Sequence, residues 1–143
     1  GTVAPGFPFV TNDRNQAAPS ILEINGEKYI ITGSNDNNLY VINSDGSLYF
    51  SVEAEDKIQT SPSFLTVNGN VFIFFGSKDN KVYGIDMKGN NLPGWPQALN
   101  GDIVGSIIFS DVDGDLVVGV GEIDAAAPPR AVALTGRERN VST

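Results

Sequence analysis

Short runs of β-branched and aromatic residues alternate with clusters of Gly, Asn, Asp and Ser along the chain. One run, VFIFF at 71–75, lies between an Asn-Gly pair and a Gly-Ser pair. Asn-Gly supplies the positive φ of a two-residue hairpin turn, and the unbroken apolar run fits a strand buried on both faces. The next strand alternates, with Val82 and Gly84 on one face and Tyr83 and Ile85 on the other. Because no stretch keeps the spacing of an amphipathic helix, the pattern predicts an all-β chain.

The same pattern occurs twice, 43 positions apart. Residues 18–46 and 61–89 align without a gap and are identical at 13 of 29 positions, mostly turn residues and alternating apolar residues. A third, weaker copy begins near Ser106, and PGFP at 5–8 matches PGWP at 93–96. The chain is therefore built from repeated units.

A repeat of this length with four short strands is typical of β-propeller blades. We predict a single propeller segment over residues 1–143, with about three blades of four antiparallel strands. Its parts are a terminal strand at 5–10, a blade at 17–53, a blade at 60–98 and an incomplete blade at 105–136. A β-sandwich is the alternative, but it has no need for a recurrent register.

Three blades are fewer than the four to eight of closed propellers. We therefore expect either a fragment of a longer protein or part of an oligomeric ring. In the ring, two chains self-associate, and the N-terminal strand at 5–10 of each completes the last blade of the other.

The stretch SPSFLTVNGNVFIFFGSKDNKVYGIDMKGNNLPGWP, at 61–96, resembles the FG-GAP/VCBS-like and quinoprotein (PQQ)-like propeller repeats of bacterial surface and periplasmic proteins. The resemblance covers nearly all of residues 5–136. It implies a propeller in an extracellular, cell-surface or periplasmic protein. Quinone-dependent members of the second family commonly use a vicinal cysteine pair, which this chain lacks. The resemblance therefore implies the shape without the quinone.

Charge and composition exclude several classes of partner and of catalytic group. The formal net charge is −8 and the isoelectric point about 4.3, which disfavours nucleic acid and anionic membranes as partners. The chain has no Cys and no His, so thiolate nucleophiles, imidazole bases and thiolate or imidazole metal sites are excluded.

The longest apolar run, at 71–75, is too short to insert across a membrane. Arg130, Arg137 and Arg139 form a small basic cluster, which we interpret as a solvated tail. We predict no enzymatic activity and no catalytic residues.

The strongest metal candidate is DVDGD, in which Asp111, Asp113 and Asp115 alternate along a turn. Carboxylates spaced in this way can direct several oxygens at a hard cation such as Ca²⁺. In the FG-GAP family a similar Asp-rich loop often binds calcium, but here Leu116 stands where that loop has Gly. An ordinary hairpin turn that uses Asp for local hydrogen bonds is the alternative.

Two other motifs have both a structural and a functional interpretation. GSNDNN at 33–38 and GSKDNK at 76–81 are Gly-rich, but they lack the following helix and Lys-Ser/Thr of a phosphate loop, so we predict simple turns. Trp95 could stack on a sugar if exposed, but we expect it to pack in the core, because Phe7 occupies its place in the N-terminal copy.

These observations predict a non-catalytic binding or scaffold module with calcium as an optional stabiliser. Its ligand would be a protein or a carbohydrate. Two alternatives stay open: an accessory portion of a larger secreted carbohydrate-active or other hydrolytic enzyme, and a platform for assembling envelope proteins.

Overall fold

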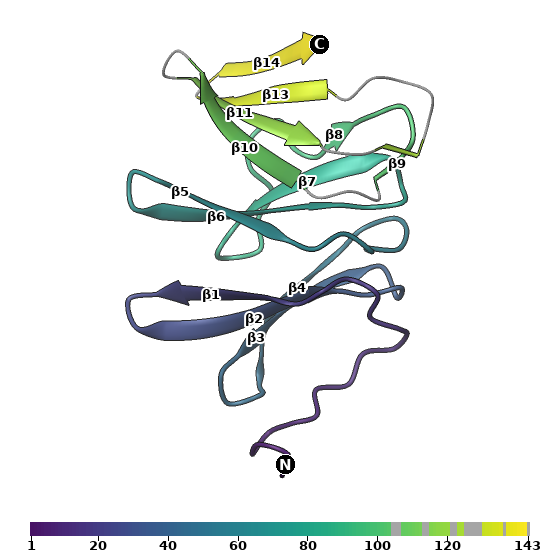
Figure 1. The fold of residues 1–143 in the computed structure, drawn as a ribbon, viewed down its shortest axis with the longest axis vertical. Coiled ribbons are helices and arrows are strands. Elements are labelled where there is room, and N and C mark those ends of the chain that lie inside the picture. The colour runs from purple at the N-terminus through teal and green to yellow at the C-terminus, as the bar shows by residue number, and fades with distance from the viewer. Residues whose placement is uncertain (104–106, 113–114, 121–122, 125–129, 136, 143) are drawn as a thin grey trace.

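The computed structural model describes residues 1–103, 107–112, 115–120, 123–124, 130–135 and 137–142, with side chains described up to residue 103 and at Ile107. All regular structure in this part of the chain is β, and three four-stranded antiparallel sheets follow one another along the sequence (Figure 1). The predicted all-β class and the four-stranded antiparallel units are confirmed. No helix long and apolar enough to cross a membrane occurs among these residues.

Each four-stranded sheet is a meander in which strands are neighbours in chain order. The first contains β1 (Ser20–Ile24), β2 (Glu27–Gly33), β3 (Asn38–Asn43) and β4 (Leu48–Glu53). The second contains β5 (Ser63–Val67), β6 (Asn70–Gly76), β7 (Lys81–Asp86) and β8 (Gln97–Ala98). The third contains β10 (Ile107–Val112), β11 (Asp115–Val120), β13 (Arg130–Thr135) and β14 (Arg137–Ser142). A separate two-stranded sheet pairs β9 (Asp102–Ile103) with β12 (Ile123–Asp124), which lies between β11 and β13 in the sequence.

Turn chemistry sets the length of each strand. Asn25 and Asn68 have φ of 51° and 49°, and each is followed by a Gly with positive φ, so both first hairpins turn on Asn-Gly as predicted. Asn37 and Asn80 adopt φ of 74° and 70° in the next turn. Asn accepts this left-handed region better than most residues, which explains why it recurs at these positions.

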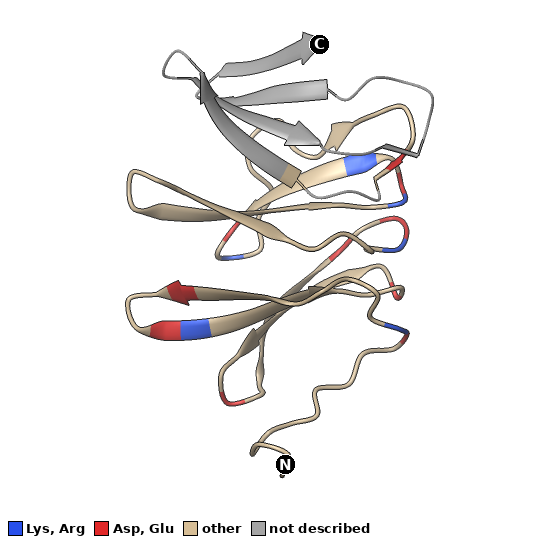
Figure 2. Ribbon diagram, in the orientation of Figure 1, with Lys and Arg blue, Asp and Glu red and all other residues tan. Residues whose placement is uncertain are grey.

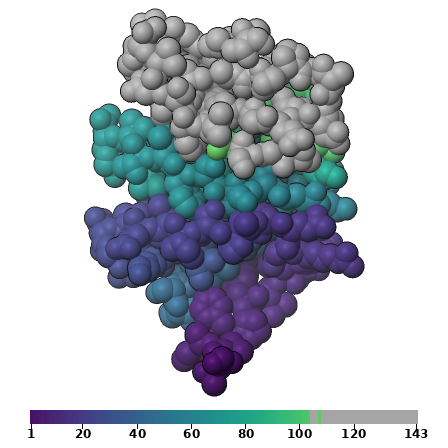
Figure 3. All heavy atoms as spheres, viewed as in Figure 1, coloured from purple at the N-terminus to yellow at the C-terminus, as the bar shows by residue number. Residues whose placement is uncertain are grey.

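The first and second sheets stack face to face, as the layers in Figure 3 show. The core between the first and second sheets includes Leu39 and Val41 from one side and Tyr83 and Ile85 from the other. Val82 lies on the opposite face of β7, in the core toward Ile107 at the start of the third sheet. The predicted division of β7 into two packing faces is therefore confirmed.

Hydrogen bonds also join the first strands of successive sheets. The hydroxyl of Ser20 donates to the carbonyl of Pro62 (2.9 Å), and that of Ser63 donates to the carbonyl of Ile107 (2.9 Å). The same side chain thus makes the same link at the start of the first and second sheets.

Two predicted boundaries differ from the structure. The last unit was expected to be incomplete and to end at 136, but β14 pairs with β13 and supplies a fourth strand, so that expectation is wrong. The segment at 137–142 is rich in charged residues because it forms a sheet edge, where charges are common. The segment at 5–10, predicted as a terminal strand, pairs with none of the described strands.

Candidate interaction surfaces

The two Gly-Ser loops are turns fastened to the linker that precedes their sheet. Ser34 and Ser77, between the second and third strands, are fully buried. The Ser34 hydroxyl donates toward the carbonyls of Asp13 and Arg14 (3.3 Å each). The Ser77 hydroxyl donates in the same way to those of Asp56 (2.9 Å) and Lys57 (3.2 Å). The serines are therefore occupied by the protein's own backbone, and the predicted turns are confirmed.

The aspartate two residues later connects the turn, the linker and the third strand. The Asp36 carboxylate accepts hydrogen bonds from the backbone N–H groups of Asn38 (3.0 Å) and Asn12 (2.9 Å) and from the Tyr40 hydroxyl (2.6 Å). Asp79 accepts the equivalent bonds from Lys81, Glu55 and Tyr83. Because these donors belong to the protein, neither carboxylate forms a free ligand cradle.

This Asp–Tyr contact shifts the ionisation of both partners. Burial opposes the charged form of Asp36, but the hydrogen bonds from Tyr40, Asn12 and Asn38 outweigh it and lower the pKa of that carboxyl. Burial, with the bond to Asp36, raises the pKa of Tyr40 to about 12. Burial and the bond to Asp79 raise the pKa of Tyr83 as well. Asp36 is thus held as the carboxylate and Tyr40 as the neutral phenol, so their contact has a structural role.

This Asp–Tyr link was not predicted from the sequence, although a signal for it is present. Asp-x-x-x-Tyr occurs at the same place in both repeats, at 36–40 and 79–83. An acceptor and a donor four residues apart across a tight turn can reach one another, so the recurrence itself pointed to a hydrogen bond.

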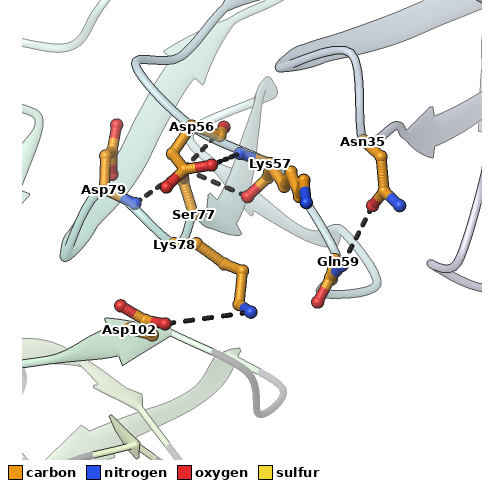
Figure 4. A network of polar contacts seen from close by, with 8 residues as sticks. All are labelled: Asn35, Asp56, Lys57, Gln59, Ser77, Lys78, Asp79 and Asp102. Carbon is orange, nitrogen blue, oxygen red and sulfur yellow. Dashed lines mark hydrogen bonds and ion pairs between the residues drawn. The ribbon is translucent and has the colours of Figure 1, made fainter. Parts of the chain in front are cut away.

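The loops and linkers at one end of the first two sheets carry both basic and acidic residues (Figure 2). We call this surface the loop face and define it by residues 34–37, 55–59, 77–81 and 100–102. Gln59 donates to Asn35 across successive repeats (3.0 Å), and Lys78 lies 3.9 Å from the Asp102 carboxylate (Figure 4). Lys81 also contacts Glu55 (2.9 Å). Ion pairs near the surface contribute about 0–1 kcal/mol to stability, so breaking them to form ion pairs with a binding partner costs little.

The predicted calcium ligands lie outside the described side chains. Asp113 is outside the described residues altogether, and only the backbone of Asp111 and Asp115 is described, at the end of β10 and the start of β11. Elsewhere, in the part of the chain whose side chains are described, no three acidic residues gather into a possible metal site. Calcium binding at this turn stays a prediction, and calorimetric titration with Ca²⁺ tests it. If millimolar Ca²⁺ produces no heat of binding, the stretch is an ordinary hairpin turn.

Trp95 is a core residue. Its side chain is 6% exposed and packs edge-on against Phe74, with ring centroids 5.2 Å apart. Gly84 makes room for it, because a β-carbon there would come within 3.1 Å of the indole ring. The prediction of a packing role is confirmed, and this indole is not an exposed platform for a sugar.

Comparisons with known proteins support the fold. No family model matches the chain, and no curated protein matches it. Among solved structures it is similar to two crystal structures of BBS1N in complex with ARL6DN. The crystal soaked with lead gives a TM-score of 0.61 at 12% identity, covering 99% of this chain and 43% of the other. The crystal soaked with mercury gives a TM-score of 0.57 at 13% identity, covering 85% of this chain and 36% of the other. The chain thus has a β-propeller-like fold and spans less than half the length of these neighbours.

Proposed function

We propose that the chain is a portion of a β-propeller, with about three blades, and that it is a non-catalytic module that binds another protein. The observation that carries this proposal is the repeated construction of the loop face. Two successive loops are held by equivalent Ser and Asp hydrogen bonds, and their outer side chains are left at the surface. A rigid scaffold that presents adjacent loops is the usual setting of a binding surface.

A protein partner fits the loop face better than a nucleic acid or a sugar. Its charges alternate in sign over a short distance, from Glu55 and Asp56 to Lys57 and Lys78, whereas a nucleic acid would require a basic surface. Its described residues include no exposed aromatic platform for a sugar. The similar BBS1N was itself crystallised in complex with a second protein, which favours the same class of ligand.

We place the protein in the periplasm, at the cell surface or outside the cell, because its repeats resemble those of proteins found there. We also propose that a propeller ring is completed by self-association, and that Ca²⁺ at Asp111, Asp113 and Asp115 stabilises the hairpin between β10 and β11. Fractionation of cells with an antibody to the chain tests the location, since recovery only with cytoplasmic proteins would contradict it.

The binding proposal is tested with a photo-crosslinking amino acid placed singly on two surfaces. Position Lys57 is exposed on the loop face, and position Lys28 is exposed at the far hairpin and serves as the matched control. A protein that crosslinks to position 57 but not to position 28 would be purified, and its binding to the wild-type chain would be measured by titration. Substitution Lys57→Glu should weaken that binding at least tenfold. Equal capture from both positions, or no effect of Lys57→Glu, would contradict the proposal.

A further inference from the structure

Two of the four tyrosines of the chain lie against one another at the surface of the first sheet. The rings of Tyr29 and Tyr49 are stacked, with centroids 5.0 Å apart and an interplanar angle of 29°. Because stacked carbon atoms in contact are about 3.5–4.0 Å apart, this larger separation of the centroids means that the rings are offset. The edge of one ring therefore lies over the other.

A β-bulge brings Tyr49 to this position. The register of β3 with β4 shifts between Val41 and Ile42, so that Tyr49 has no register partner on β3. The side chain of such an extra residue is turned away from the regular alternation of the strand. Tyr29 lies on β2, which pairs with β1 and β3 but not with β4. The contact between Tyr29 and Tyr49 thus spans β3 and joins two strands that are not neighbours.

The hydroxyl groups of these two tyrosines have no structural partner. Tyr40 and Tyr83 each donate a hydrogen bond to an aspartate. The hydroxyls of Tyr29 and Tyr49 form no hydrogen bond with any described residue. Both phenols of the stacked pair are therefore available for chemistry that the fold does not use.

The second repeat shows that packing does not require tyrosine at these positions. The equivalent positions, 43 residues further on, hold Phe72 and Leu92, which are partly buried and pack against a core without a hydroxyl. Tyr29 packs against its core in the same way, but Tyr49 is 46% exposed. A pair of phenols, one of them at the surface, distinguishes the first sheet from the second.

Two phenols in contact can be joined by oxidation. Removal of one electron and one proton from each tyrosine gives two phenoxyl radicals, in which the unpaired electron spreads to the ring carbons beside the oxygen. A carbon–carbon bond then forms between one such carbon of each ring. The hydrogen atom on each of these carbons moves to the oxygen and restores the phenol. The net change is the loss of two electrons and two protons, and rotation of the exposed Tyr49 side chain allows the two carbons to meet.

The other tyrosines have no partner for this reaction. Tyr40 packs edge-on against Phe9, and Tyr83 stacks on Phe75 with ring centroids 4.9 Å apart. Phenylalanine has no phenol and forms no phenoxyl radical. A radical at Tyr40 or Tyr83 therefore finds no second radical in contact with it.

We propose that Tyr29 and Tyr49 are a site of oxidative modification, at which a dityrosine bond crosslinks β2 to β4 across β3. The oxidant is hydrogen peroxide used by a haem peroxidase. One peroxide molecule accepts the two electrons and two protons, its O–O bond breaks, and two water molecules form. This inference goes beyond the proposed binding function and does not depend on it.

Such a bond would act as a disulfide does in other proteins. The chain has no Cys and therefore forms no disulfide of its own. A covalent bond between residues 29 and 49 closes the chain between them and so restricts the unfolded state. The crosslinked chain should therefore resist unfolding better than the unmodified chain.

Treatment of the purified chain with peroxidase and hydrogen peroxide tests the proposal, at about 1 μM chain to disfavour bonds between molecules. Cleavage after acidic residues then places Tyr29, Tyr40 and Tyr49 on three separate fragments, which are 28–36, 37–45 and 46–53. Mass spectrometry should find the first and third fragments joined, with a mass below their sum by two hydrogen atoms. The fluorescence of dityrosine gives a second readout.

Three tyrosine variants separate this bond from general oxidation. Tyr29→Phe and Tyr49→Phe each keep the ring and remove one phenol, so each should reduce the joined fragments at least tenfold. Tyr40→Phe is the matched control and should leave their yield unchanged. Denaturant titration should show a higher unfolding midpoint for the oxidised wild type than for the untreated wild type, and no such rise for oxidised Tyr49→Phe.

Four results would overturn the proposal. These are the absence of joined fragments in the oxidised wild type, their presence only in covalent dimers, an equal yield of bonds to the fragment that contains Tyr40, and an unfolding midpoint that the crosslink leaves unchanged. None of these measurements uses the loop face. The test at Lys57 can therefore fail while this one succeeds, and the reverse also holds.

Discussion

Ile58 lies directly against the backbone of Gly33, so closely that a β-carbon at Gly33 would come within 2.3 Å of Ile58 Cγ2. One repeat later, a β-carbon at Gly76 would come within 2.1 Å of Ile103 Cγ2. Both isoleucines are fully buried. The glycine at the end of the second strand of the first and second sheets is therefore required for the close packing of the following linker, and this explains the recurrent Gly-Ser.

Gly33→Ala should lower the free energy of unfolding by about 1–3 kcal/mol, because the added methyl overpacks the contact with Ile58. Denaturant titration measures this loss. In an Ile58→Ala background, which itself costs about 2–5 kcal/mol, the alanine at 33 has room and its effect should shrink. Strict additivity of the two substitutions would show that the contact does not limit position 33.

Tyr40→Phe and Tyr83→Phe should each destabilise the fold by about 0.5–1.5 kcal/mol, the net contribution of one hydrogen bond. Both remove a hydroxyl that donates to an aspartate and leave the ring in place. Tyr49→Phe is the control, because Tyr49 is an exposed tyrosine, and its effect should stay within about 0.5 kcal/mol. Thermal and denaturant unfolding compare the three, and equal effects would argue against the Asp–Tyr link.

Acid should weaken the fold through Asp36. Its pKa in the folded chain lies below the ordinary value of 3.8, so the folded state favours the carboxylate. The stabilisation is present above the unfolded pKa and is lost as pH falls through the folded pKa. Unfolding measured between pH 6 and 2 should therefore depend less on pH in Asp36→Asn than in the wild type. If the variant keeps the wild-type dependence of stability on pH, other carboxyl groups cause the acid sensitivity.

Alkali should weaken the fold through Tyr40. Its folded pKa of about 12 exceeds the unfolded value of 10.0, so the folded state retains the proton. The resulting stabilisation is complete below pH 10 and is lost as pH rises through 12. Phenolate absorbance should show late ionisation of this tyrosine, and Tyr40→Phe should lose less stability than the wild type above pH 10. An absorbance titration in which every tyrosine ionises near pH 10 would contradict this.

Periodicity was sufficient to predict the inner strands of the first two sheets and the two faces of β7. Val82 and Tyr83 face different cores because side chains alternate along a strand, and Asn25 and Asn68 turn where Asn-Gly occurs. β14 was missed because a strand at the edge of a sheet needs no apolar alternation. The bonds from Asp36 to Asn12 and from Ser34 to Asp13 were missed because they join residues more than 20 positions apart, and only the folded chain brings them together.

The hairpin tips at Asn25-Gly26 and Asn68-Gly69 differ from the loops at the opposite end in one practical respect. A β-carbon at Gly26 or Gly69 would meet nothing within 4 Å, whereas the linkers at 12–14 and 54–58 are hydrogen-bonded to the turns beside them. These tips are therefore the places where an epitope tag or a fluorescent protein can be inserted without loosening neighbouring units, and they allow the chain to be followed in cells with its loop face unobstructed.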